Sequence, residues 1–177
     1  RFPEICFVRC FMDPIMRKSG LTPDQKLRLS MYDPLKKGPV TEEGQRRISI
    51  LGSDFALDET SDLKRLLRCN DYQIKESPVC ESWEDYLSLS DCRMMLNCYP
   101  SGKAGTEWAA ERLGRPFMYL PSCFDYDEII GQLAALSESM ELLGVLDYEG
   151  EKESCEAALH EALLAVGNWP IAITRAF

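Results

Sequence analysis

Only one histidine, His160, occurs among the 177 residues, which excludes a histidine-rich metal site or a Ser-His-Asp triad built from this chain alone. His160 lies among acidic residues of a predicted helix and away from every predicted strand end, which favours a surface position. The chain has no low-complexity tract, and no apolar run approaches the roughly 18 residues that a membrane span requires. The sequence therefore predicts a folded protein without a membrane partner.

Three familiar motifs are also missing. No G-x-G-x-x-G dinucleotide fingerprint follows a predicted strand, no Walker A phosphate loop is present, and no two cysteines form a C-x-x-C pair. The segment Gly102–Thr106 comes closest to a phosphate loop because it joins a predicted strand to a helix. Its backbone amides could hold an anion at the helix N-terminus, but an ordinary glycine-containing turn explains the same residues.

The net charge of −9 is unevenly distributed. Residues 1–50 carry ten Lys or Arg and six Asp or Glu, so the remaining residues carry −13. An acidic body of this kind argues against a nucleic-acid partner. The acidic residues from Glu149 to Glu161 are predicted to form a solvated helix face. The acidic loop at residues 54–62 either binds Mg²⁺ or caps the next helix, and the lack of a phosphate motif favours capping.

Eight cysteines are spread along the chain without the spacing of a small disulfide-stabilised secreted scaffold, so we expect reduced thiols and a cytoplasmic location. They are Cys6, Cys10, Cys69, Cys80, Cys92, Cys98, Cys123 and Cys155. Cys6 and Cys10 share one face of a predicted strand because their spacing is even. They either face a metal cluster or are buried structural thiols, and burial is the favoured interpretation.

Short apolar runs recur at regular intervals and are typical of strands buried on both faces of a parallel sheet. The predicted strands are Ile5–Met12, Ile48–Leu51, Tyr72–Glu76, Met94–Cys98, Phe117–Leu120 and Pro170–Thr174. The predicted helices between them are Lys26–Tyr32, Asp62–Arg68, Trp83–Leu89, Thr106–Leu113, Asp125–Leu143 and Glu151–Val166. This alternation predicts an α/β fold, Rossmann-like and doubly wound, with a mainly parallel sheet and helices on both faces.

Several helices have recognisable start and stop signals. Thr22–Gln25 combines a cap residue, a proline at the first helical position and a glutamine at the third. Thr60 or Ser61 can cap the second helix and Ser82 the third. Glycines follow the later helices at positions where a left-handed backbone suits glycine: Gly114, Gly144 and Gly167.

The chain opens on Arg1 rather than a methionine and ends at Phe177, directly after a strand-like run, which suggests an internal piece of a longer protein. We expect residues 1–150 to form the Rossmann-like domain. Residues 151–177 are expected to supply a helix and a strand that lead into a following domain. The strand at Pro170–Thr174 is expected to pair at a sheet edge or with another copy, because an unpaired apolar edge favours association.

In doubly wound sheets, ligands bind beyond the carboxyl ends of the strands. The residues at those ends are Met12–Pro14, Gly52–Asp54, Cys98–Ser101 and Pro121–Cys123. Cys98 is distinctive because an apolar strand ends there and a turn containing Pro100 and Gly102 begins. A thiolate would be favoured there by the dipole of the helix expected from Thr106, and a buried inert cysteine is the alternative.

The stretch Arg93–Ser101, RMMLNCYPS, followed by Glu107–Met118, resembles the middle domain of nitrogenase component 1 subunits. In that family a strand ends in a Cys-Tyr-x-Ser turn, and a helix and a strand that begins with Gly-x-Pro follow. Arg47–Asp54 is similar to the family's strand entering that domain, with Leu63–Leu67 as its helix, and Phe124–Ile130 is similar to the next helix start. The likeness covers nearly the whole chain, and the order of elements carries more of it than identical residues.

The resemblance implies an oxidoreductase subunit that pairs with a second component 1-type subunit and receives electrons from an ATP-dependent iron–sulfur reductase. The cysteine of the family's turn ligates the metal cluster, so Cys98 is the implied metal ligand, with Tyr99, Ser101 and Gly102 as implied cofactor-binding residues. The implied cofactor is an iron–sulfur or iron–sulfur-derived cluster in the full-length protein. None is expected in this piece alone, because a cluster needs several ligands. No catalytic residue is implied.

The turn also departs from the family pattern. Gly102–Ala104 stands where nitrogenase has Met-Asn-Tyr, and the family's histidine ligand belongs to a later domain, so dinitrogen reduction is not implied. Two other functions stay open on the same fold. One is a non-catalytic scaffold on which a cofactor is assembled, and the other is a small-ligand-binding α/β domain.

Overall fold

The computed structural model describes residues 20–144 and 146–167. The chain divides into two compact units, Arg1–Val145 and Leu146–Phe177, which are described separately. The predicted strands Ile5–Met12 and Pro170–Thr174, and the loop Met12–Pro14, lie outside the described residues.

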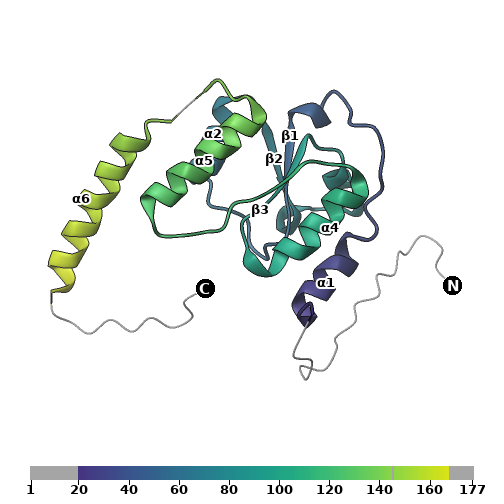
Figure 1. Ribbon diagram of the computed structural model, residues 1–177, viewed down its shortest axis with the longest axis horizontal. Helices are drawn as coiled ribbons and strands as arrows, with labels where there is room; N and C mark the ends of the chain where they lie inside the picture. The colour runs from purple at the N-terminus through teal and green to yellow at the C-terminus, as the bar shows by residue number, and fades with distance from the viewer. Residues whose placement is uncertain (1–19, 145, 168–177) are drawn as a thin grey trace. The chain divides into compact units, whose positions relative to one another are not determined.

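The first unit is built on a four-stranded sheet in which every strand pair is parallel (Figure 1). Its strands are β1 (Arg47–Ile50), β2 (Gln73–Glu76), β3 (Met94–Asn97) and β4 (Phe117–Tyr119). Their spatial order is β2-β1-β3-β4. The parallel sheet with helices on both faces confirms the predicted α/β fold.

Burial distinguishes the central strands from the edge strands. Every residue of β1 and β3 is buried, as the apolar runs predicted. The edge strand β2 reads Gln-Ile-Lys-Glu and buries only Glu76 fully, while β4 is half-buried throughout. An edge strand has one neighbour instead of two, so part of its surface stays in contact with water. The expectation of burial on both faces therefore holds only for the two central strands.

Helices cover both faces of this sheet (Figure 1). The helices of the first unit are α1 (Pro23–Tyr32), α2 (Asp62–Cys69), α3 (Trp83–Leu87), α4 (Lys103–Leu113) and α5 (Tyr126–Met140). Short 3₁₀ turns lie between them: η1 (Gly44–Arg46), η2 (Ser77–Val79), η3 (Ser88–Ser90) and η4 (Pro100–Gly102). Helices α1 and α4 pack against each other on one face, and α2 and α5 lie on the other.

The cap signals predicted two of the helix starts correctly. The hydroxyl of Thr22 accepts from the Gln25 amide at 3.2 Å, and the Gln25 side chain accepts from the Thr22 amide at 2.9 Å, which forms a complete capping box for α1. Ser82 caps α3 by accepting from the Asp85 amide at 3.0 Å. Ser61 occupies the N-cap position of α2 but makes no capping hydrogen bond through its side chain.

Several predicted helix boundaries were wrong. Helix α4 begins at Lys103 instead of Thr106, because η4 leads directly into it. Helix α5 ends at Met140 instead of Leu143, with Glu141 in a left-handed conformation at φ 55°. The Asn70 carboxamide oxygen accepts from the amides of Leu143 and Gly144 at 2.9 and 2.7 Å. These bonds hold the segment after α5 in a non-helical path.

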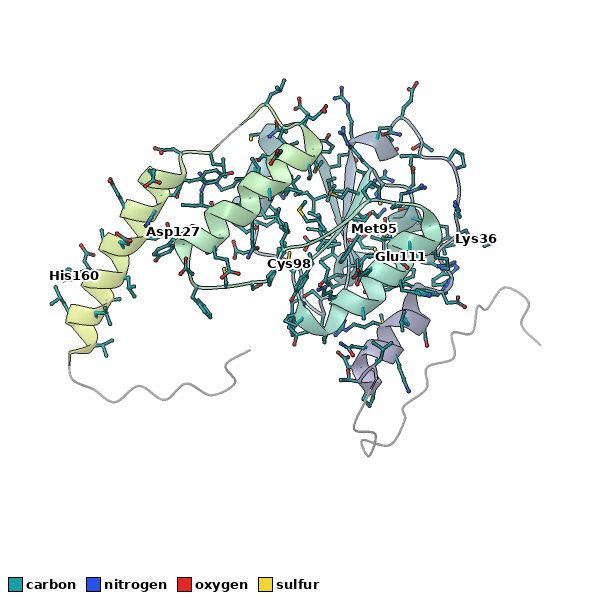
Figure 2. The ribbon with its side chains drawn as sticks, viewed as in Figure 1. Lys36, Met95, Cys98, Glu111, Asp127 and His160 are labelled. Carbon is teal, nitrogen blue, oxygen red and sulfur yellow. The ribbon has the colours of Figure 1, made fainter. Side chains whose placement is uncertain are left out.

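The second unit contains helix α6 (Tyr148–Val166), which begins three residues before the predicted Glu151. Asp147 caps it by accepting from the Gly150 amide at 3.1 Å. His160 is exposed on this helix (Figure 2), as predicted, and so are most of its acidic residues. Among the described helices, none combines the length and apolarity needed to cross a membrane.

The main core of the first unit lies between the sheet and the helices α1 and α4. It is formed by buried side chains that include Tyr32, Leu35, Leu51, Met95 and Leu113. Burying a large aliphatic side chain contributes about 1.5–3 kcal/mol, so this cluster provides much of the stability. The chain leaves β1 toward β2 and then returns to β3 on the other side of β1. The topological switch point therefore lies between the carboxyl ends of β1 and β3.

Candidate functional site

At the switch point, two glycines close the gap between the loops that follow β1 and β3. A Cβ atom on Gly102 would lie 2.4 Å from the Cα of Gly52, and Gly52 has a left-handed φ of 87°. The Asn97 side chain fills the space beneath them and donates to the Leu51 carbonyl at 2.7 Å. Backbone-to-backbone packing therefore occupies this part of the crevice, and Gly102 is a packing residue here.

Cys98 follows β3 directly and lies on the opposite face of the sheet from Asn97, because successive residues of an extended strand point to opposite faces. Only 7% of Cys98 is exposed. Its side chain lines a cavity of about 220 Å³ together with residues of α2 and α5, among them Leu63 and Leu133. Figure 2 shows Cys98 at the carboxyl end of the central strand.

The loop after β4 forms another wall of this cavity. The Leu120 amide donates to the Asn97 carbonyl at 2.9 Å, which continues the strand pairing by one residue. The amide and hydroxyl of Ser122 then both donate to the Cys98 carbonyl, at 3.3 and 3.4 Å. The next residue, Cys123, lines the same cavity. The two loops therefore bring two cysteines to one cavity.

Burial, together with the smaller effect of the nearby Glu76 carboxylate, raises the pKa of the Cys98 thiol to about 12. The thiol is therefore protonated at neutral pH, and the expectation of a stabilised thiolate was wrong for this structure. The physical reason is the position of the side chain. Cys98 faces α2 and α5, whereas the helix α4, whose dipole was expected to lower the pKa, covers the other face of the sheet.

The third wall of the cavity is held by a buried ion pair. The Lys64 ammonium pairs with the Glu76 carboxylate, and these residues are 1% and 5% exposed. Lys64 also donates to the Leu57 carbonyl at 2.8 Å, and Glu76 accepts from the Leu57 amide at 2.7 Å. Leu57 lines the cavity. The sequence reasoning missed this pair, although a lysine among the leucines of α2 was an available signal.

The acidic loop at residues 54–62 forms ion pairs and a turn. Asp54 pairs with Arg28, Glu59 with Lys64 and Asp62 with Arg65. Asp58 accepts from the Thr60 amide, and none of the four carboxylates caps α2. Asp62 nevertheless lies in the first turn of α2, where a carboxylate is favourable. In the described parts of the chain, no group of three or more His, Cys, Asp or Glu residues could hold a metal ion.

The remaining predicted site residues point elsewhere. Tyr99 is 37% exposed, and the guanidinium carbon of Arg28 lies 5.8 Å from the centre of its ring. Ser101 has a buried hydroxyl without a hydrogen-bond partner. The structure therefore divides the predicted set: Cys98 faces the cavity, Gly102 packs on Gly52, and Tyr99 meets α1.

Arg28 is a second residue that the sequence reasoning did not select. It is 4% exposed on α1 and binds both carboxylate oxygens of Asp54, at 3.0 and 3.1 Å. Asp24 accepts a further bond from Arg28 at 3.3 Å. Arg28 thus ties α1 to the loop after β1 and to Tyr99, the residue beside Cys98.

No protein-family model matches this chain, and no curated protein matches it. The functional argument therefore depends on the residues and on their geometry.

Proposed function

We propose that this chain is part of a nitrogenase-like oxidoreductase subunit of the component 1 type. In the full-length protein, the subunit receives electrons from an ATP-driven iron–sulfur reductase and reduces a substrate at a metal cluster or bound ligand. Its proposed partners are that reductase and a second component 1-type subunit, in the cytoplasm. The observation that carries the proposal is the position of Cys98, which follows the central strand β3 and lines a cavity at the carboxyl edge of the sheet.

The residues at this edge are compatible with one ligand of such a cluster. Cys98 offers a sulfur donor in a largely apolar setting, and thiolate sulfur is the usual ligand of iron–sulfur centres. A cavity of about 220 Å³ is smaller than the roughly 300–1,000 Å³ of typical ligand pockets. This chain would therefore supply one wall of the site. The cluster would supply the redox chemistry, and Cys98 would hold it.

The proposal is tested by replacing Cys98 with Ala in the full-length protein, purified without oxygen. We expect lost iron and sulfide, or lost electron transfer to substrate, while the urea midpoint changes little. Cys155→Ala is the matched control, because Cys155 is exposed on α6. Unchanged metal content and turnover in the Cys98 variant would overturn the proposal.

The mostly apolar lining of the cavity and the protonated thiol favour a second candidate, a small-ligand-binding α/β domain. The assembly-scaffold function uses the same metal ligand and differs in lacking turnover. Iron and sulfide analysis of the full-length protein separates these functions. A metal-free protein that binds a small solute supports ligand binding, and a loaded protein that transfers its cluster without turnover supports the scaffold.

A further inference from the structure

We propose that Cys98 and Cys123 together form a two-sulfur site for a soft metal ion of low coordination number, such as Cu(I). The inference rests on the proposed function in one respect, which is that both take Cys98 to be a metal ligand. It adds Cys123, to which the resemblance assigns no role.

The two cysteines are brought together by backbone bonds between their loops. Both the amide and the hydroxyl of Ser122 donate to the Cys98 carbonyl, so the residue before Cys123 is fixed to the backbone of Cys98. Both cysteines then line the same cavity of about 220 Å³. Neither forms a disulfide in the described part of the chain.

The sulfur of Cys123 is oriented by neighbouring polar groups. It accepts from the side-chain amide of Gln132 at 3.8 Å and lies 3.7 Å from the Asp125 carbonyl, to which its thiol donates. Gln132 belongs to α5 and also lines the cavity. The Cys123 thiol is therefore positioned on the cavity wall by α5 and by the loop that precedes it.

A third group in the cavity has no partner. The hydroxyl oxygen of Ser61 is buried without a hydrogen bond, although Ser61 lines the same cavity from the N-terminus of α2. A buried polar atom without a partner is costly, so a bound group that gave this hydroxyl a partner would relieve that cost.

The number of donors selects the kind of ion. Structural zinc sites use four ligands from Cys, His or carboxylates, and no group of three or more such residues exists in the described segments. Two sulfurs in an apolar cavity suit a soft ion that two thiolates satisfy, and soft thiolates select Cu(I). As the two metal–sulfur bonds form, each thiol releases its proton to solvent. The metal keeps its oxidation state, so no oxidant is needed.

The test is an anaerobic Cu(I) titration of the whole chain against the competing chelator bicinchoninate. Wild type is compared with Cys98→Ala, Cys123→Ala and the double variant. We expect each single variant to bind one equivalent of Cu(I) less tightly than wild type does, because both sulfurs hold the same ion. For the same reason, the double variant should lose only that one equivalent. A Cys69→Ala/Cys155→Ala variant keeps that equivalent, because both residues are exposed and neither lines the cavity.

Additive losses, or Cu(I) retained by either single variant, would overturn the two-sulfur site. Circular dichroism identifies any variant that fails to fold, and Cys98→Ser then replaces Cys98→Ala.

The outcome of this test is distinguishable from that of the proposed function. If the full-length Cys98→Ala variant loses native iron and the Cys123→Ala variant still binds Cu(I), the oxidoreductase proposal is upheld and the two-sulfur site is overturned. If instead both single variants lose the same equivalent of Cu(I), and the full-length protein contains no native iron and transfers no electrons, the two-sulfur site is upheld and the oxidoreductase proposal is overturned.

Discussion

The buried ammonium of Lys64 and the buried carboxylate of Glu76 form an ion pair that binds both polar groups of the Leu57 backbone. Leu57 belongs to the loop after β1 and lines the cavity beside Cys98. The ion pair thus connects α2 and the edge strand β2 to a wall of the candidate site. Because both charges are withdrawn from water, each depends on the other for its stability in the interior.

Replacing Lys64 with Met should lower the free energy of unfolding by about 3–5 kcal/mol, because Glu76 would remain buried without its counter-ion. Urea unfolding measures the change. Arg65→Met in the same helix is the matched control. Its salt bridge with Asp62 joins side chains that are 41% and 39% exposed, so we expect a loss of about 0–1 kcal/mol. Equal losses of unfolding free energy in the two variants would contradict the claim that the buried pair contributes more to stability than the exposed one.

Gly102→Ala should destabilise the first unit by about 1–3 kcal/mol, because the added methyl group meets the backbone of Gly52. Gly131 provides a matched control inside α5, where a Cβ atom has nothing within 4 Å. Gly131→Ala should raise stability by about 0.5–1 kcal/mol, since alanine is the better helix former. Thermal unfolding of both variants measures this difference in sign. A Gly102 variant as stable as wild type would show that the two loops separate easily.

The pKa of Cys98 predicts a pH dependence of stability. An unfolded cysteine ionises near pH 8.5, whereas burial raises the folded pKa of Cys98 to about 12. The folded state then holds a proton that the unfolded state has lost. The contribution of this thiol is therefore fully present below about pH 8.5 and is lost progressively as the pH rises toward 12.

Urea unfolding at pH 8 and pH 10 measures this effect in wild type and in Cys98→Ala. We expect wild type to lose more stability than the variant between the two pH values, because only wild type carries the buried thiol. A parallel loss in both proteins would assign the pH dependence to other groups and would contradict the raised pKa.

Local patterns predicted the elements whose causes are local. The Thr22–Gln25 capping box depends on side chains three residues apart, so α1 could be recognised from its own sequence. The central strands β1 and β3 were recognisable because burial on both faces demands an apolar residue at nearly every position. The alternation of strand and helix then limited the fold to a parallel α/β sheet.

One boundary that was predicted wrongly, the end of α5, depends on a distant residue. Helix α5 ends before Gly144 because Asn70, more than seventy residues earlier, accepts from the amides beyond Met140. The edge strand β2 was predicted within one residue of its observed bounds. What the sequence did not predict is the burial of Glu76, which depends on its pairing with Lys64 of α2.

By itself, the sequence determined that this protein forms a parallel α/β sheet and that a cysteine stands where the third strand ends, because hydrophobic periodicity and helix capping act over a few residues. Only the tertiary structure decided which way that cysteine faces. Cys98 lines one cavity with Cys123 and with Leu57, whose backbone the Lys64–Glu76 pair holds, while Gly102 packs against Gly52. These relationships depend on which loops lie side by side at the carboxyl edge, and the order of strands across the sheet determines that.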